Sequence, residues 1–425
     1  MNKRFLAATA ATVSLVLLAT GCAAAEPPSA IRATEAATPA PVAADPDSPY
    51  AGLSQEELDT KLIAAAWAND LDAATLLIAA GADVNAKDST VQSAYLIAAS
   101  EGYLPLLNLT LENGADVASL DSWNGTGLIR AGERGHAGIV GRLVQAGIDL
   151  DHVNNLGWVA LHEALVFAKP AQVDAYVDTV RVLVAAGADV TIRTERDGRT
   201  PTQLAQQESL APQAELLDAA KAITEDQTDA DQRLLAAAEE GDADAAALAL
   251  RAGADIEARN RLQQTPLLLA STHDHVDVAR LLVALGADPD ALDHQQDTAW
   301  LVTGVTGSVE MLEALLPATP DMAIPNRFGG LSPIPAGERG HLDYIKRVVS
   351  TDVDLDHVNN LGWTALLETV LFGDGSQRYT QIVNVLIEAG ADVSIPDKDG
   401  VTALEHARNR GLTDIARALE MAGAN

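Results

Sequence analysis

The sequence predicts an all-α repeat solenoid, a fold in which short helix pairs stack along the chain. The tripeptide Gly-Ala-Asp occurs six times, and the spacings from Gly81 to Gly114, from Gly187 to Gly253 and from Gly253 to Gly286 are 33, 66 and 33 residues. Each interval holds two apolar runs with helical spacing, as in Val278, Leu281 and Leu282. A Gly that suits a helix C-terminus follows the second run, and a Thr that suits a helix N-cap often precedes the first.

The composition supports this class and limits the partners. Of the 425 residues 48% are hydrophobic but only 4% are aromatic, and small aliphatic side chains suit closely packed helices. The 28 Lys and Arg face 60 Asp and Glu, so the chain should repel nucleic-acid phosphates and we expect no nucleic-acid partner. The acidity favours a basic protein partner, although solubility alone also accounts for it. The single Cys excludes an intramolecular disulfide and a Cys-based zinc site.

Residues 1–21 are predicted to be a signal peptide, because Lys3 and Arg4 precede an uncharged apolar stretch that is short for a membrane span. The stretch ends in Leu-Ala-Thr-Gly before Cys22. This resembles the lipobox of bacterial lipoproteins, although Ala19 stands where Leu is commonest. The resemblance implies that Cys22 is lipidated, becomes the mature N-terminus and carries more than one lipid chain, which gives stable anchoring. The alternative is an ordinary secreted protein with an incidental Cys.

Residues 22–49 are rich in Ala and Pro and have no apolar period, which predicts a disordered tether. Together these features predict an extracytoplasmic protein that is anchored by lipid to a bacterial membrane, at the cell surface or in the periplasm. Cys22 is its only expected contact with that membrane.

Residues 50–425 are predicted to form about eleven repeat units. The glycines that follow the second apolar runs are Gly81, Gly114, Gly147, Gly187, Gly253, Gly286, Gly390 and Gly423. Two further units have Ala220 and Thr319 at this position. Seven extra residues near 165–175 and five near 371–378 interrupt the period.

Several predicted helix starts resemble the Thr-Pro-Leu-His-x-Ala motif of the ankyrin-repeat family: "TPLLLAS" at Thr265, "TALLET" at Thr364 and "TALEHA" at Thr402. The resemblance covers about residues 55–425. Only "VALHEA" keeps the family His, at His162, and several units lack the Pro. The resemblance implies stacked ankyrin helix-turn-helix units joined by β-hairpin loops, with a role in protein–protein interaction.

A sub-boundary near 220–230 is compatible with the sequence. The unit before it resembles the C-terminal cap, "DGRTPTQLA" beside "DGVTALEHA", and the unit after it resembles the first unit. One continuous solenoid and two stacked blocks both fit. The spacing of 66 residues that is kept across the join favours one continuous solenoid.

The decapeptide DLDHVNNLGW occurs at Asp149–Trp158 and again at Asp354–Trp363, 205 residues later. This offset equals six periods and the seven-residue insertion, so both copies take the same place in their unit. In ankyrin repeats this place is the β-hairpin that joins successive helix pairs, and such hairpins usually contact partners. We expect Asn154 and Gly157 to shape the turn.

The other tip positions are predicted to be exposed and are the candidate partner-binding residues. They are Val153, Asn155, Leu156 and Trp158, their equivalents Val358, Asn360, Leu361 and Trp363, and Trp123 on a neighbouring tip. Apolar tips are unusual on an acidic surface, and Trp is a common interface anchor. The alternative is that each Trp packs on the neighbouring hairpin or on the insertion that follows it.

The sequence contains no pattern that predicts catalysis or metal binding. His273 and His275 lack a third ligand at a defined spacing, so we expect no metal site. Strand-like alternation would place Asp149 and His152 on opposite faces, which argues against an acid–base pair. The chain has no nucleophile elbow, phosphate loop or zinc signature, so we expect neither enzyme activity nor a cofactor.

These features predict a membrane-anchored, extracytoplasmic, monomeric scaffold that binds another envelope or secreted protein. Two alternatives stay open. Resemblance to exported bacterial ankyrin proteins that are linked to peroxide defence beside catalase implies an envelope stress-tolerance factor. The acidic surface also fits a toxin-neutralising, immunity-type binder if the toxin is basic.

Overall fold

The computed structural model describes residues 49–223 and 228–424. The contact pattern separates Met1–Pro39 from Ala40–Asn425. The first of these units lies wholly outside the described residues, as do the predicted signal peptide, Cys22 and all but the last residue of the predicted tether. The architecture below is therefore that of the second unit.

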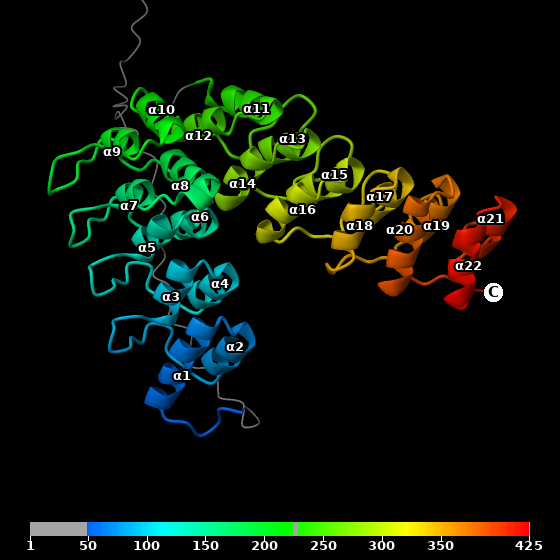
Figure 1. Ribbon diagram of the computed structural model, residues 1–425, viewed down its shortest axis with the longest axis horizontal. Helices are drawn as coiled ribbons and strands as arrows, with labels where there is room; N and C mark the ends of the chain where they lie inside the picture. The colour runs from blue at the N-terminus through cyan, green and yellow to red at the C-terminus, as the bar shows by residue number, and fades with distance from the viewer. Residues whose placement is uncertain (1–48, 224–227, 425) are drawn as a thin grey trace, which may run out of the picture. The chain divides into compact units, whose positions relative to one another are not determined.

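Helices in the described residues come in pairs, and each pair forms one repeat (Figure 1). The first block, residues 49–223, contains α1 (Gln55–Ala68) with α2 (Leu71–Ala79), α3 (Ala94–Glu101) with α4 (Leu104–Glu112), α5 (Gly127–Arg134) with α6 (Ala137–Gln145), α7 (Ala160–Val166) with α8 (Val173–Ala185), and α9 (Pro201–Gln207) with α10 (Ala211–Ala220).

The second block, residues 228–424, continues the same pattern. It contains α11 (Ala230–Glu240) with α12 (Ala243–Arg251), α13 (Pro266–Thr272) with α14 (Val276–Ala284), α15 (Ala299–Thr306) with α16 (Val309–Leu315), α17 (Pro333–Arg339) with α18 (Leu342–Val348), α19 (Ala365–Phe372) with α20 (Gln377–Glu388), and α21 (Ala403–Asn409) with α22 (Thr413–Met421). Two short 3₁₀ helices, η1 (Pro170–Gln172) and η2 (Leu316–Ala318), complete the set. The predicted all-α repeat solenoid is confirmed.

The loops between repeats differ in one respect from the predicted β-hairpins. Across residues 49–223 and 228–424 they form turns without regular strands, and a single antiparallel bridge joins Leu120 to Thr126. In these loops backbone groups bond within the turn, as Asn154 N–H does to the Trp158 carbonyl, or to a neighbouring loop, as Asn155 N–H does to the Trp123 carbonyl.

Capping residues set the helix ends. The hydroxyl of Thr265 accepts the backbone N–H of Leu268 at 3.2 Å, and Thr364 caps α19 in the same way through Leu367. Gly286, which follows α14, has a φ of +90°, a left-handed conformation that favours Gly. Thr319 takes the same place after η2 and is held at a φ of +52°.

Within each block, every helix packs on the equivalent helix of the next repeat. In the first block α1, α3, α5, α7 and α9 form one row and the second helices of the pairs form another. In the second block the rows run from α11 to α21 and from α12 to α22. Leu and Ala side chains from both rows build the core between them.

The two blocks meet through their second helices. α12 lies against α8, and α14 lies against both α6 and α8, as Figure 1 shows. Among the described helices no substantial contact joins α9 to α11, so the row of first helices is interrupted between the blocks. The row of second helices continues across the junction, because α10 also contacts α12.

Side-chain chemistry accounts for the interruption. α9 exposes Gln203, Gln206 and Gln207, which offer no apolar surface for a following helix. In contrast, α12 is rich in Ala, and Ala246 and Ala247 are fully buried, so its backbone can approach α8 closely.

Polar bonds also cross the junction. Arg181 of α8 donates from Nε to Asp244 of α12 at 2.6 Å and from Nη1 to Asp178 at 3.1 Å. Gln145 donates from Nε2 to the carbonyl oxygen of Ala284 at 2.7 Å. The bonds to Asp244 and Ala284 join residues of the first block to residues of the second.

Candidate partner-binding surfaces

The two copies of the decapeptide adopt the same turn. Asn154 N–H donates to the Trp158 carbonyl at 2.9 Å, and Asn359 N–H donates to the Trp363 carbonyl at 3.0 Å. Gly157 has a φ of +75°, which fits its predicted role in the turn. The repeated residues therefore encode one repeated loop geometry.

The side chain of Asn154 holds this turn together. Its Oδ1 accepts the backbone N–H groups of Leu156 at 2.9 Å and Trp158 at 3.1 Å. Its Nδ2 donates to Oε1 of Glu163, on α7, at 2.8 Å. Each polar atom of this buried amide thus has a partner, and the tip is fixed to the helix behind it.

Asn359 makes the same bonds in the second copy. Its Oδ1 accepts Leu361 N–H at 2.9 Å and Trp363 N–H at 3.0 Å, while its Nδ2 donates to Glu368 of α19 at 2.8 Å. The repeated unit therefore extends beyond the decapeptide to a glutamate nine residues after the asparagine.

Both glutamates are buried carboxyl groups. Burial raises the pKa of Glu163 to about 7, against the smaller lowering effect of the Asn154 hydrogen bond. Burial, assisted by the charge of Glu338, likewise raises the pKa of Glu368 to about 7. Carboxyl groups with such pKa values change charge near neutral pH.

Other repeats place the opposite chemistry at this spacing. Asp121 faces Arg130 at 3.6 Å, and Asp397 lies 2.7 Å from Nε2 of His406. There an acidic loop residue meets a basic helix residue. Only the duplicated loops, among these four, combine a neutral amide with a carboxyl group.

Most of the predicted tip residues are exposed. Asn155, Leu156, Val358, Asn360, Leu361 and Trp123 all lie at the surface, with Leu156 49%, Leu361 51% and Trp123 59% exposed. The structure corrects the expectation for Val153, Trp158 and Trp363, which are half-buried.

Aromatic packing explains the burial of the two tryptophans. The Trp158 ring meets Phe167 edge to face with centroids 6.3 Å apart, and Trp363 meets Phe372 at 5.8 Å. Both Phe residues lie at the start of the inserted segments, so the Trp side chains pack on the insertions and are half-buried.

Three aromatic residues complete the tips but were not among the predicted site residues. Phe167 is 41%, Phe372 is 49% and Phe328 is 55% exposed. The Phe328 carbonyl accepts Asn360 N–H as the Trp123 carbonyl accepts Asn155 N–H, both at 2.9 Å. The offset of 205 residues, which relates Trp123 to Phe328 and Phe167 to Phe372, was the signal that could have found them.

We call these two clusters the twin surfaces. The first surface consists of Trp123, Leu156, Trp158 and Phe167, and the second surface consists of Phe328, Leu361, Trp363 and Phe372. Each combines a bulky apolar tip with an aromatic pair that is fixed by the loop behind it.

The insertions lengthen the second helices. α8 has 13 residues and α20 has 12, whereas α6 and α14 have nine each. Tyr176 donates its hydroxyl to the Glu133 carbonyl at 2.9 Å, and Tyr379 donates to the Glu338 carbonyl at 3.0 Å. The insertions are therefore tied to the preceding repeat at matching points.

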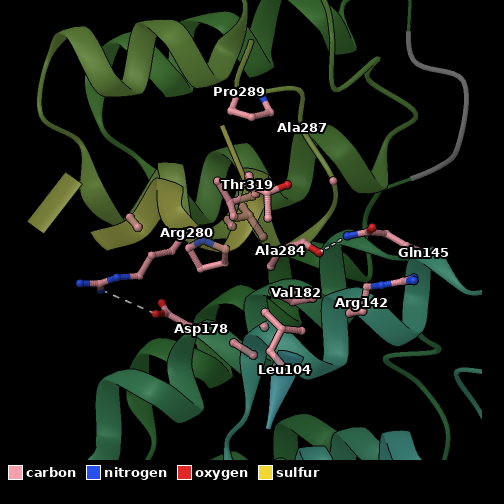
Figure 2. A pocket seen from close by; sticks show the side chains of 18 of the residues that line it. Leu104, Arg142, Gln145, Asp178, Val182, Arg280, Ala284, Ala287, Pro289 and Thr319 are labelled. Carbon is pink, nitrogen blue, oxygen red and sulfur yellow. Dashed lines mark hydrogen bonds and ion pairs between the residues drawn. The ribbon is translucent and has the colours of Figure 1, made fainter. Parts of the chain in front are cut away.

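A cleft of about 920 Å³ lies where the two blocks meet, and Figure 2 shows it from close by. α4, α6, α8, α14 and α16 line it. Its arginines already have partners: Arg142 donates to Asn108 at 2.7 Å, and Arg280 lies 3.8 Å from Asp178. Of these two pairs, Arg280–Asp178 joins the blocks across the cleft, whereas Arg142–Asn108 lies within the first block.

The described residues contain no group of three or more His, Cys, Asp or Glu side chains placed to hold a metal. His273 and His275 stack with ring centroids 5.9 Å apart, and His275 bonds to the Glu239 carbonyl at 3.0 Å. None of the described helices is both long enough and apolar enough to cross a membrane.

Comparison with known proteins gives the family. The profile for ankyrin repeats in three copies matches residues 95–194 and 234–326, and the profile for a single ankyrin repeat matches residues 62–89. YahD of Escherichia coli, named as a putative ankyrin repeat protein, is 37% identical over 191 residues, which cover 45% of this chain and 95% of YahD.

Two crystal structures are also similar. An ankyrin repeat domain from Acinetobacter baumannii AYE is 40% identical, with a TM-score of 0.44, and the match covers 45% of this chain and 98% of that one. The ankyrin repeat protein EF0377 is 35% identical, also with a TM-score of 0.44, over 46% of this chain and 98% of its own. From the matched profiles and the near-complete coverage of YahD it follows that this chain belongs to the ankyrin-repeat family, whose repeats bind other proteins.

Proposed function

We propose that the protein is a membrane-anchored, extracytoplasmic scaffold that binds a protein partner through the twin surfaces. The observation that carries the site is the recurrence of one loop geometry, with its apolar tip and aromatic pair, at two places in the chain. A core-packing role alone needs no exposed Leu at either tip, yet Leu156 and Leu361 are each about half exposed.

The duplication favours a partner that offers the same docking segment twice. Binding at the first surface raises the effective concentration of the partner at the second, so two weak contacts produce a tight complex without new chemistry. A dimeric or repetitive envelope or secreted protein meets this requirement. Each docking segment would place an apolar side chain against the Trp–Phe pair.

The sequence favours a location outside the cytoplasm. Cys22, at the end of the lipobox-like segment, would carry the lipid, and residues 22–49 would separate the repeats from the bilayer. Replacing Cys22 by Ser should move the protein from the membrane fraction to the soluble fraction and abolish labelling with a radioactive fatty acid. Retention of both properties in the Cys22→Ser form would refute this anchor.

The partner site is tested by affinity capture from detergent-solubilised envelopes of the producing cell. Full-length wild-type bait is compared with a Trp158→Ala/Trp363→Ala form. Trp67→Ala is the matched control, because Trp67 is 48% exposed on α1 and lies outside both surfaces. We expect one protein that binds to the wild type and the control but not to the double variant.

Three other results have defined meanings. Equal capture by all three baits removes the twin surfaces as the site but leaves a scaffold. Capture by none of them argues against a stable complex and favours the stress-tolerance alternative, which a deletion strain tests through its growth in peroxide. Loss of the complex in the control as well points to misfolding rather than to a site.

The net charge of −32 favours a second candidate function, in which the protein binds and neutralises a basic toxin as an immunity protein does. A basic toxin would gain from long-range attraction to this chain, and the attraction falls as salt screens it. A captured basic protein whose affinity drops steeply between low and physiological salt supports this function. An acidic or neutral partner with salt-independent affinity argues against it.

A further inference from the structure

Glu163 and Glu368 are buried carboxyl groups whose neighbours do not neutralise them. Glu163 is 3% and Glu368 is 6% exposed. Each accepts one side-chain hydrogen bond, from Asn154 and Asn359 respectively. Neither forms an ion pair within the described ranges, 49–223 and 228–424.

The preceding repeat supplies the charges that face them. Around Glu163 these are Glu133 and Arg130 of α5 and Asp121 of the preceding loop, with Arg130 already engaged by both acids. Around Glu368 they are Glu338 and Arg339 of α17. In neither place does an arginine of the preceding repeat reach the buried carboxylate as an ion pair.

The other helices packed against them supply no bonded cation either. α9 carries no titratable side chain. The charged residues of the remaining neighbours are Asp174, Asp178 and Arg181 on α8, Arg378 and Glu388 on α20, and Glu405, His406 and Arg408 on α21. Of these, Arg181 is engaged by Asp178 and Asp244, and His406 by Asp397.

We propose that Glu163 and Glu368 are pH-dependent switches that control how the twin surfaces are presented. With its proton, each glutamate is compatible with the closed loop, in which the asparagine fixes the apolar tip. Without the proton, each glutamate favours an open loop in which water reaches the carboxylate. The inference rests on the proposed function, since it concerns the regulation of the surfaces proposed above for partner binding.

The geometry gives the direction of the effect. The Asn154 side chain links Glu163 Oε1 to the backbone N–H groups of Leu156 and Trp158, so a movement of Asn154 with the tip would replace its bond to the carboxylate by water. The raised pKa of about 7, against the ordinary glutamate value of 4.5, means that the closed loop holds the proton more tightly than the open loop. The closed loop is therefore favoured at acidic pH and weakened as pH rises through 7.

The size of the effect follows from the same pKa. With a closed-loop pKa of about 7, the ratio of closed to open loops falls about tenfold between pH 6 and pH 8 at each site. A partner that needs both surfaces would feel the two changes together. The duplicated loops thus make binding stronger at mildly acidic pH.

The test needs no partner. Full-length protein labelled with fluorotryptophan gives one ¹⁹F resonance for each of its five tryptophans, which are assigned by single Trp→Phe changes. We expect the resonances of Trp158 and Trp363 to titrate with midpoints near pH 7. Glu163→Gln should abolish the titration of Trp158 alone, and Glu368→Gln that of Trp363 alone.

Each single variant contains its own control in the other copy of the loop. Glu388→Gln, which changes an exposed carboxylate on α20, should leave both titrations unchanged. His152 and His357 lie in the same loops, where their Nε2 atoms bond to the carbonyl oxygens of Asn124 and Gly329. The Gln variants keep both histidines, so a Trp158 titration that survives Glu163→Gln would overturn the proposal.

A second measurement on the wild type guards against a misfolded variant. The backbone amides of Leu156 and Leu361 bond to the two asparagine side chains, so their hydrogen exchange reports loop opening. After correction for the intrinsic pH dependence of exchange, we expect about tenfold faster exchange at pH 8 than at pH 6. A pH-independent corrected rate would contradict the switch.

The outcomes for the switch and for the proposed function are separate. Intact titrations together with partner capture that ignores Trp158→Ala/Trp363→Ala would keep the switch and remove the partner site. Absent titrations together with capture lost in that double variant would keep the partner site and remove the switch.

Discussion

Gly141 of α6 lies so close to Ala284 of α14 that a Cβ atom on Gly141 would overlap the Ala284 carbonyl oxygen. The two residues belong to different blocks, and the neighbouring Gln145 bonds to that same oxygen at 2.7 Å. The absence of a side chain at position 141 is thus what allows α6 and α14 to touch.

We predict that Gly141→Ala destabilises the junction by about 1–3 kcal/mol, because the added methyl forces the two helices apart. Gly138→Ala is the matched control on the same helix, since a Cβ there meets nothing within 4 Å. It should stabilise the protein by about 0.5–1 kcal/mol through higher helix propensity. Urea unfolding of both variants checks the pair, and equal shifts in one direction would show that α6 and α14 are not in close contact.

A second prediction concerns Arg181, whose side chain is only 16% exposed between Asp178 and Asp244. Arg181→Met should cost about 2 kcal/mol or more, because it leaves Asp178 buried without its main cation. Asp178→Asn in the same chain should recover part of that loss. The double-mutant cycle is measured by chemical denaturation, and additive effects would mean that the pair does not interact.

The pH dependence of this variant follows from the same pair. Burial already raises the pKa of Asp178, and Arg181 opposes that effect. Removing Arg181 should raise the pKa further, so the loss of stability should be larger at pH 8 than at pH 5. A loss that is constant over this range would indicate that Asp178 gains solvent in the variant.

The third prediction concerns global stability. Glu163 and Glu368 have folded-state pKa values of about 7, above the ordinary value of 4.5. The folded state therefore binds their protons more tightly than the unfolded state does. Their contribution to the free energy of unfolding is fully present below pH 4.5 and is lost as pH rises through 7. The maximum loss is roughly 3 kcal/mol for each glutamate. Carboxyl groups with lowered pKa values, such as Asp397, act in the opposite sense but below pH 4.

The window from pH 5 to pH 8 therefore isolates the two glutamates when wild type is compared with Glu163→Gln/Glu368→Gln. We expect the urea midpoint of the wild type to fall over this window by more than that of the variant. Parallel curves would show that the glutamates do not change charge on unfolding in this range.

The fourth prediction uses Thr319, which occupies the place of the repeat Gly after η2 with a φ of +52°. A β-branched residue in this conformation is strained, so Thr319→Gly should stabilise the second block by about 1 kcal/mol. Gly187→Ala, at a φ of +95° with free space around it, should produce a loss of similar size. A destabilised Thr319→Gly form would mean that the Thr side chain contributes more than its backbone strain costs.

The sequence was most informative where the physics is local and repeated. The 33-residue period, the Thr caps and the left-handed Gly positions each depend on residues a few places apart, so the amino-acid pattern alone was enough to assign Thr265 and Gly286. The outcome for exposure was mixed. Leu156 and Leu361 lie at the surface as predicted, whereas Trp158 and Trp363 lean on Phe residues of the insertions.

Contacts between residues far apart in the chain could not be predicted from the sequence. Arg181 and Asp244 are 63 positions apart, and neither position has a pattern that marks the other. The Asn154–Glu163 bond is intermediate between the local capping patterns and the distant contacts in how far it could be predicted. Its nine-residue spacing recurs with Asn359 and Glu368, so a comparison of the two copies beyond the decapeptide would have revealed it.

The bond from Gln145 to Ala284 closes a loop of 139 residues. In a simple solenoid each repeat contacts only its neighbours, so folding can start anywhere and stability is nearly a sum of local terms. Here the junction adds contacts between residues far apart in the chain. Forming them requires the chain to lose the conformational entropy of closing a long loop. The two blocks should therefore each fold quickly and then dock in a slower step, and damage at one end of the chain should be felt cooperatively at the other.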